Sequence, residues 1–294
     1  MKNFRFVVGR NLTLYLENKI YLAFSCLAII TIMSMYFIFL RDFMFQMVED
    51  KGISRTMRGL ISDRLMVSGL LMVVSTVTCF GGIHLQIKEK EVSEASENLT
   101  LPISIETITL GNLFSVTAIS ASYTMLTFIT YEFYFYYRYG SELTSETAVI
   151  VLLTILFASF INAVTLYVLT ARIRTRAEFF SFASLYGIIF GFLTGAYLPY
   201  FFYAKWLKKL LFLLPSTQTT SIIRQLFLTD TLAGIRPKLS IRQLESFKTS
   251  FGIYLKDLTS KRMIMRQEQY ALLLVEVLLV LGGILISLRR SQER

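Results

Sequence analysis

The sequence predicts an all-α, polytopic membrane protein whose 294 residues form a single transmembrane domain. Hydrophobic residues make up 54% of the chain and charged residues only 17%, whereas soluble domains carry about 25% charged residues. The hydrophobic residues also fall in long blocks rather than on one face of amphipathic elements. We expect six transmembrane helices, an N-terminal amphipathic interfacial helix and short outer re-entrant helices.

The six predicted spans cover residues 20–40, 65–87, 107–131, 148–171, 179–204 and 271–288. Each is close to or above the ~18–20 residues that cross the hydrocarbon core of a bilayer. Such segments must be helical, because every backbone amide needs an internal hydrogen-bond partner where water is absent. The first span is too long for a cleavable signal peptide, and Arg41-Asp42 follows it where small residues would be needed.

Basic residues favour an orientation with both termini in the cytoplasm. Six spans place the termini on one side, and that side gathers the basic residues of 2–19, 88–90, 172–176 and 289–294. The two short loops of the other side hold fewer, and the extracellular segment 205–269 is too long to count in the positive-inside rule. We therefore expect a multi-pass protein of a bacterial plasma membrane. The net charge of +10 is spread over both sides, which argues against nucleic acid as a partner.

Two segments near the membrane boundaries have an amphipathic or aromatic pattern. In residues 1–19, Phe4, Val7, Val8, Leu12 and Tyr15 follow helical spacing, which predicts an interfacial helix; a few frayed turns before the first span are the alternative. At the end of the third span, residues 131–139 are mostly aromatic. They are typical of an aromatic belt at a membrane boundary, with a stacking platform for a ligand as the alternative.

The fifth predicted span and its continuation carry packing signals. Gly187, Gly191 and Gly195 follow at four-residue spacing, which predicts a smooth strip for close helix packing. Residues 206–214 are too short to span the membrane and contain two lysines, so we expect a re-entrant or surface-lying helix on the outer face. Residues 230–269 are mixed and polar, which suggests one or two external helices.

The connection between the second and third spans, residues 88–106, is acidic in a basic protein. Its apolar residues can share one helical face, and Pro102 disfavours helix at the residue before it. Ser104 is placed to cap the third span. A solvated linker is the alternative, but we favour a docking surface for another protein. The expected docking residues are Glu89, Glu91, Val92, Glu94, Ala95, Glu97 and Leu99.

The order of these features resembles the membrane (permease) subunit of a type-2 ATP-binding-cassette (ABC) exporter. The resemblance covers nearly the whole chain: a basic N-terminal helix, a Glu-rich loop ending in Leu-Pro-Ile-Ser, a fifth span ending in Gly-Ala-Tyr-Leu-Pro, a short outer helix ending in Leu-Pro, and a sixth span. One feature departs from the family, whose loop usually has a glycine after its acidic residues, whereas Val92-Ser93-Glu94-Ala95 stands here.

The resemblance implies a permease that moves a hydrophobic or amphipathic compound, such as a drug, toxin, lipid-like molecule or small peptide, out of the cell. Two copies, or one copy and a homologous permease, would pair, and each would rest on a separate ABC ATPase subunit that holds ATP and Mg. This chain would bind no cofactor and would not be catalytic by itself. In the family the cavity between the two subunits is lined mainly by spans 2 and 5, which gives as candidate substrate contacts Met72, Ser75, Thr76, Phe190, Thr194 and Tyr197.

The remaining reactive residues point to no catalytic or metal site. Cys26 and Cys79 lie in predicted spans, the chain has one histidine, and no phosphate-binding glycine motif occurs. Glu132 and Glu276 lie within spans, where a carboxylate usually pairs or faces water; a proton or cation pathway is the functional alternative. Two other functions stay open: a membrane-embedded enzyme acting on lipids or envelope precursors, and a membrane partner protein that transports nothing.

Overall fold

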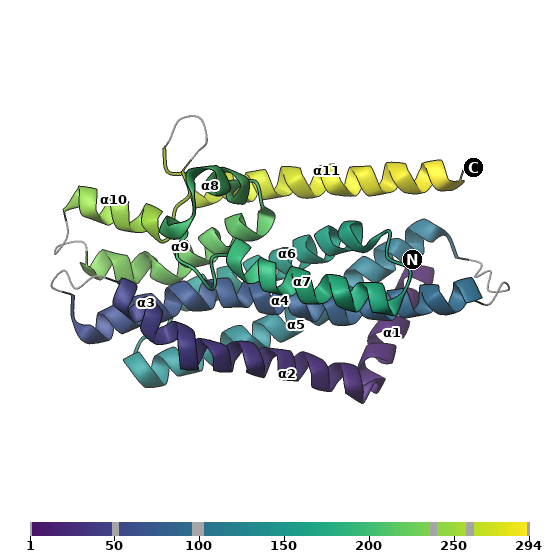
Figure 1. Cartoon of the computed structure of the whole chain (residues 1–294), viewed down its shortest axis with the longest axis horizontal. Coiled ribbons are helices and arrows are strands. Elements are labelled where there is room, and N and C mark those ends of the chain that lie inside the picture. The colour runs from purple at the N-terminus through teal and green to yellow at the C-terminus, as the bar shows by residue number, and fades with distance from the viewer. Residues whose placement is uncertain (1, 49–52, 96–102, 236–239, 257–261, 293–294) are drawn as a thin grey trace.

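The computed structural model describes residues 2–48, 53–95, 103–235, 240–256 and 262–292, and within these ranges the chain is helical (Figure 1). An isolated antiparallel bridge between Lys256 and Met263 is the only β-type pairing in that part of the chain. Six helices are long and apolar enough to cross a membrane. The predicted all-α polytopic membrane fold is therefore confirmed.

The six membrane-crossing segments follow the predicted apolar blocks, with shifted ends. The first joins α2 (Lys19–Met35), the π-helix η1 (Tyr36–Leu40) and α3 (Arg41–Met47). The others are α4 (Arg55–Ala95), α5 (Ile105–Tyr139), α6 (Ser145–Thr170), α7 (Arg176–Leu193) and α11 (Arg266–Gln292). With 41 residues at 1.5 Å each, α4 is about 60 Å long and projects well beyond the ~30 Å hydrocarbon core.

Polar caps set the starts of three spans. Ser104, Thr144 and Thr175 precede α5, α6 and α7, and each side-chain oxygen accepts a hydrogen bond from the backbone N–H three residues later. Each bond satisfies one of the amides that the first helical turn leaves without a partner. The predicted cap at Ser104 is therefore present.

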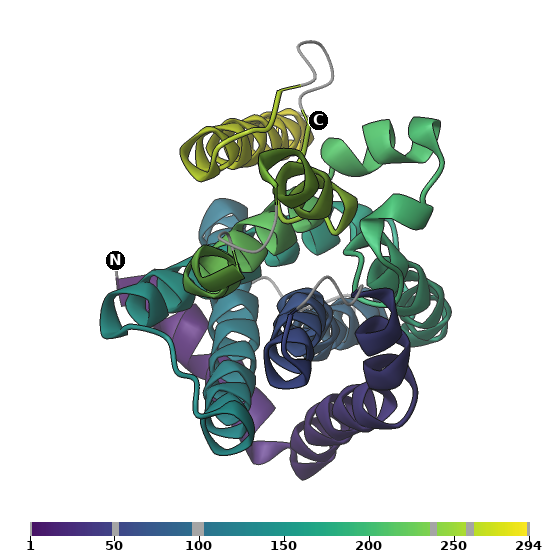
Figure 2. The ribbon, with the colours of Figure 1, turned by 90° about the vertical axis from the view of Figure 1, so that its left-hand side faces the viewer.

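The helix α4 forms the centre of the bundle, and it packs against α2, α5, α6 and α7. Of its most apolar window, 83% is buried, whereas the corresponding fractions are 6% for the first span and 17% for both α7 and α11. Figure 2 looks along the bundle and shows α2 and α7 at its periphery, on the same side of α4. The peripheral spans therefore carry the apolar side chains that face away from the protein.

Both chain termini lie at one end of the elongated bundle, which we call the termini end (Figure 1). The end of α4, the start of α5 and the start of α7 lie at the same end. The opposite end, called the far end below, holds α3, the start of α4 and α10 (Ile241–Ser250).

The predicted N-terminal amphipathic helix is present as α1 (Lys2–Glu17), and it lies across the bundle at the termini end (Figure 1). Its buried residues Val7, Asn11 and Tyr15 recur every four positions, so they form one helical face. That face packs on α5, where a Cβ at Gly111 would lie 2.6 Å from the Val7 side chain. The glycine therefore permits the close approach of the two helices.

The chain after α7 differs from the expected continuous span to residue 204. The helix ends at Leu193, and Gly195 takes a left-handed φ of 67°, a backbone conformation that glycine adopts without strain. The chain then forms η2 (Tyr200–Phe202) and α8 (Lys205–Phe212). The turn packs tightly on α4, since a Cβ at Gly69 would lie 2.8 Å from the Cα of Ala196.

The segment expected to be wholly external contains an internal helix, α9 (Pro215–Ile235). Every residue from Ser216 to Leu228 is buried, and the helix packs against α4, α6 and α11. Its polar composition conceals this position, because Ser216–Ser221 is a run of hydroxyl and amide side chains. These groups are accommodated by hydrogen bonds, such as that from Thr217 to the Leu193 carbonyl at 2.8 Å.

Candidate functional site

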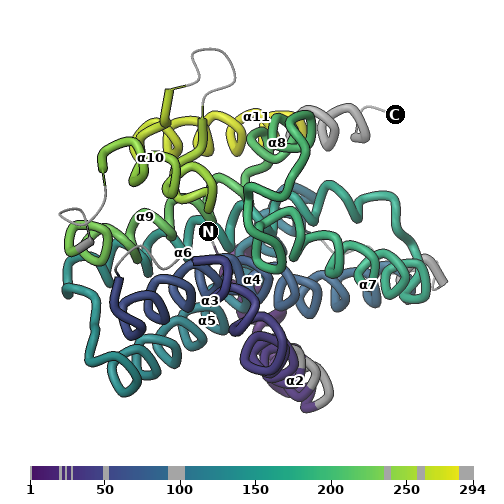
Figure 3. Tube along the Cα trace, turned by 60° about the vertical axis from the view of Figure 1, so that its left-hand side comes forward, coloured from purple at the N-terminus to yellow at the C-terminus, as the bar shows by residue number. Residues whose placement is uncertain are grey.

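An apolar groove lies between α2, α4 and α7, and Figure 3 shows the course of these three helices. Its volume is about 830 Å³, within the range of small-molecule sites. Three helices and their extensions supply its walls: Leu27, Thr31, Ile32, Met35 and Leu40 from the first span, Val73 and Val77 from α4, and Ser184, Gly187, Ile188, Phe192 and Tyr197 from α7 and the turn after it. Carbon-rich walls with hydroxyl-bearing side chains at Thr31, Ser184 and Tyr197 suit an apolar or amphipathic molecule.

The groove contains one of the six residues that the family resemblance suggested, Tyr197. The other five point into the protein: Met72, Ser75, Thr76, Phe190 and Thr194 are all nearly fully buried. Ser75, for example, lies within hydrogen-bond distance of Ser120 at 3.0 Å and accepts a bond from Asn162 at 2.9 Å, which joins α4 to α5 and α6. The residues of α4 that face the groove are instead Val73 and Val77, which directly follow Met72 and Thr76 in the sequence.

The three glycines of the predicted packing strip have different roles. Gly187 borders the groove, and a Cβ there would meet only a Phe80 ring atom at 3.9 Å. Gly191 leaves room for the Tyr197 ring, which would clash with any larger residue. Gly195 forms the left-handed turn that ends α7. Within the described chain, the strip therefore shapes the groove and the turn beyond it.

Arg224 of α9 contacts the turn that follows α7. Its guanidinium, only 3% exposed as a residue, donates to the Gly195 carbonyl at 2.7 Å, the Phe251 carbonyl at 2.9 Å and the Ser68 hydroxyl at 3.1 Å. A fourth, longer bond reaches the Leu65 carbonyl at 3.3 Å. Burial lowers the pKa of Arg224 to about 10, so the side chain stays charged at neutral pH. One residue therefore ties the turn after α7 to α4 and to the end of α10.

At the termini end, two of the expected docking acids form ion pairs within the chain. Both carboxylate oxygens of Glu89 accept a hydrogen bond from the Arg10 guanidinium of α1, at 2.6 Å each. Glu91 accepts a 2.6 Å hydrogen bond from Arg176 at the start of α7. Both pairs are partly exposed. The end of α4 is thus tied to α1 and to α7, which borders the groove.

The other expected docking residues lie at or beyond the end of α4. Val92, Glu94 and Ala95 belong to its last helical turn, while Glu97 and Leu99 lie outside the described residues. The helical start of this acidic segment is therefore a direct extension of the second span. A force on this extension acts on the same rigid helix that forms one wall of the groove.

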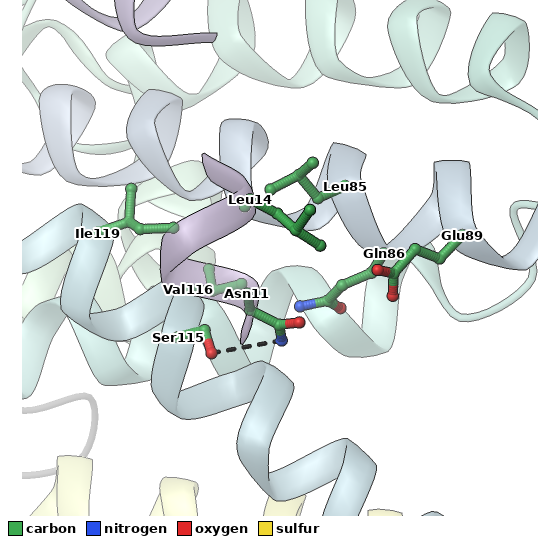
Figure 4. Close-up of a pocket in the computed structure, with 9 residues that line it drawn as sticks. Asn11, Leu14, Leu85, Gln86, Glu89, Ser115, Val116 and Ile119 are labelled. Atoms are coloured by element: carbon green, nitrogen blue, oxygen red, sulfur yellow. Dashed lines mark hydrogen bonds between the residues drawn. The ribbon is translucent and has the colours of Figure 1, made fainter. Parts of the chain in front are cut away.

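The junction of α1 with α4 and α5 is held by amide groups (Figure 4). Asn11 donates to Asn112 at 2.8 Å and, more weakly, to Ser115 at 3.4 Å, the dashed line in Figure 4. The cavity beside them measures about 10 Å³, which is the space of a single water molecule. This junction is a joint between helices, not a ligand site.

Sequence reasoning missed a buried charge cluster at the far end. Asp63 of α4 is 1% exposed; it accepts hydrogen bonds from Tyr139 at 2.6 Å and Tyr134 at 3.0 Å, and it pairs with Arg41 at 3.4 Å. The neighbouring Arg64 donates to the Phe227 carbonyl of α9 at 2.7 Å. These groups lock α3, α4, α5 and α9 together at that end. The signal in the sequence was the pair Asp63-Arg64 directly before an apolar block.

The two intramembrane acids lie apart from the groove lining. Glu132 accepts a bond from the Leu143 backbone N–H at 3.3 Å, which helps to fix the connection between α5 and α6. Glu276 of α11 is partly buried, and its Oε2 has no hydrogen-bond partner among the described residues. Among the described residues, neither acid takes part in an ion pair.

The described residues form no cluster suited to bind a metal ion. They contain no group of three or more His, Cys, Asp and Glu side chains that could hold a metal ion, and Cys26 and Cys79 are free thiols. No protein-family model, curated protein or solved structure matches this chain. The geometry and the chemistry of its residues are therefore the basis for any functional assignment.

Proposed function

We propose that this protein is the permease subunit of an ATP-driven ABC exporter and that the groove between α2, α4 and α7 carries its hydrophobic or amphipathic cargo out of the cell. One observation carries the proposal. The two helices that form facing walls of the groove, α4 and α7, are linked outside the groove by the Glu91–Arg176 ion pair. A push on the projecting end of α4 is therefore passed to the other wall of the same groove.

The proposed orientation places the termini end in the cytosol of a bacterial cell. The surplus of basic residues on that side supports it. A separate ATPase subunit, which holds ATP and Mg, would dock there against the end of α4. Since Glu89 and Glu91 are engaged with Arg10 and Arg176, docking falls to the residues that follow them in the sequence: Val92, Glu94 and Ala95 at the end of α4, and Glu97 and Leu99, which lie outside the described residues.

The proposed mechanism is alternating access, in which one group of helices moves against another around a central site. Closure of the ATPases pushes on α4, and the two ion pairs carry the movement to α1 and α7. Each pair is partly exposed and contributes only about 0.2–1 kcal/mol. The pairs therefore guide the movement of the helix ends but do not hold the bundle together.

A second permease copy, or a homologous one, completes the path in this proposal. The first span and α7 are the spans that flank the groove, and most of their apolar windows are unburied within one chain. Exposed residues such as Ile30 and Ile188 stand on these helices. A facing copy would cover this surface and enclose the groove, while lipid covers the remaining apolar faces.

The direct test reconstitutes the chain in lipid together with a candidate ABC ATPase subunit. Co-purification of the two subunits and cargo-stimulated ATP hydrolysis are the expected results. A groove-filling Gly187→Phe variant should keep the complex intact but abolish cargo stimulation, because the residue borders the groove and has open space around it. The matched control is Ile189→Phe, on an exposed position of the same helix outside the groove lining. Equal loss in both variants would contradict the assignment of the groove.

A further inference from the structure

The short helix α8 (Lys205–Phe212) has one face against the protein and another that nothing in the described chain covers. Leu211 and Phe212 are buried, whereas Trp206 is 70% and Leu210 is 49% exposed. Leu213, directly after the helix, is also exposed. Positions 206, 210 and 213 follow one another at four and three residues, so they share one side of the helix. An apolar stripe led by a tryptophan is thus turned outward.

The position of α8 along the bundle coincides with a membrane boundary. The 18 residues of α7 rise about 27 Å, close to the thickness of the hydrocarbon core, so Leu193 lies near the far-end boundary. Two hydroxyls fix α8 at that level: Tyr203 donates to the Phe192 carbonyl, and Tyr200 donates to the Lys208 carbonyl. Figure 2 looks along the bundle and shows α8, the green helix that follows α7 and η2, lying across the view instead of end-on.

Within the described part of the chain, the lysines of α8 have no acidic partners. No Asp or Glu occurs between Glu178 and Asp230, and none of the ion pairs found among the described residues includes Lys205 or Lys209. Both are exposed and stand four residues apart, beside the apolar stripe. Lys208 differs from them, because it donates to the Phe201 carbonyl at 3.2 Å and lies 5.5 Å from the centre of the Tyr200 ring.

We propose that α8 is a lipid anchor that lies in the far-end leaflet, the outer one in the proposed orientation, and that Lys205 and Lys209 recognise anionic lipid headgroups. Trp206, Leu210 and Leu213 enter the acyl boundary below, in the manner of interfacial amphipathic helices. Each lysine near an anionic surface favours binding about fivefold. This role is independent of cargo transport, so it stands or falls without the proposed permease function.

The chain offers a reporter for this proposal, since Trp206 is its single tryptophan. The full-length protein is reconstituted in phosphatidylcholine vesicles that contain a fixed fraction of phosphatidylglycerol. Tryptophan emission is then quenched with the brominated form of one lipid or the other. We expect a blue-shifted emission, resistance to aqueous acrylamide, and stronger quenching by brominated phosphatidylglycerol than by brominated phosphatidylcholine. The double variant Lys205→Gln/Lys209→Gln should lower this preference at least several-fold while Trp206 stays in the lipid.

The matched control is Arg242→Gln on α10, an exposed basic residue in the part of the far end beyond α8, which should leave the lipid preference unchanged. Quenching by acrylamide but not by brominated lipid would place α8 in water and overturn the proposal. Shielding from both quenchers would indicate a protein partner on this surface and would also overturn it. Equal quenching by the two brominated lipids would eliminate headgroup recognition.

Discussion

Replacing Arg224 with methionine should strongly destabilise the far end of the bundle. The substitution keeps an unbranched, flexible side chain but removes every donor that reaches Gly195, Phe251 and Ser68. The Leu65 carbonyl lies within α4 and keeps its helical bond, so the loss falls mainly on the Gly195 and Phe251 carbonyls. An unsatisfied buried acceptor costs about 1–3 kcal/mol, which gives about 2–6 kcal/mol for the two.

Part of that loss is offset, because the variant no longer buries a cation without an acidic partner. We therefore expect a net loss of about 3 kcal/mol, which corresponds to a fall in unfolding temperature of about 6–12 °C for a chain of this size. Arg224→Lys should fall between the variant and the wild type, since one ammonium cannot reach acceptors on three separate elements.

Thermal unfolding in detergent, followed by the emission of Trp206, measures this effect close to the altered region. Arg242→Met on α10 is the control, because Arg242 is exposed and its side chain makes no hydrogen bond or ion pair among the described residues. An Arg224→Met protein that unfolds within about 2 °C of the wild type would refute the reasoning. The same result would remove Arg224 as the tie between the turn after α7 and the helices around it.

Three further predictions concern the helix junctions. Arg176→Glu should place two carboxylates together and lower cargo-stimulated hydrolysis up to about fivefold, while the unfolding temperature stays nearly unchanged. Adding Glu91→Arg should restore activity. Equal activity of the single and double variants would contradict a transmitting role. Gly111→Leu should displace α1, because a Cβ at this position would already lie 2.6 Å from the Val7 side chain. Proteolysis near the N-terminus should therefore accelerate. Gly9→Leu, with open space around it, should not have this effect. Asp63→Asn should lower the unfolding temperature by several degrees, because Arg41 loses its charged partner; an unchanged temperature would show that the tyrosines alone hold this junction.

The sequence was sufficient to predict the elements that depend on local composition. Long uncharged blocks located all six membrane-crossing segments, because a helix is the only structure that satisfies its own backbone there. The cap at Ser104 and the helix α1 also follow from local sequence patterns. The end of α7 could not be predicted in this way, since Gly195 and Pro199 interrupt an apolar run that still has the composition of a span.

Helix rotation could not be derived from the sequence. The apolar region of α4 is hydrophobic around most of its circumference, so periodicity does not separate Val73 and Val77, which face the groove, from Ser75, which faces α5 and α6. The burial of α9 could not be derived from the sequence either. Its polar residues are buried because neighbouring helices supply hydrogen-bond partners. The pairs Arg10–Glu89 and Arg176–Glu91 join residues far apart in the chain, and no local pattern contains them.

The most direct test of the central claim is site-specific photocrosslinking at the end of α4 in intact bacteria. A photoreactive residue is placed at Glu94, and a second version carries it at Trp206 on the exposed face of α8. The account predicts a crosslink between position 94 and a cytosolic ATPase subunit, and none from position 206. If position 94 instead captures no ATPase, or is labelled from outside the cell, the proposed transmission through α4 is wrong.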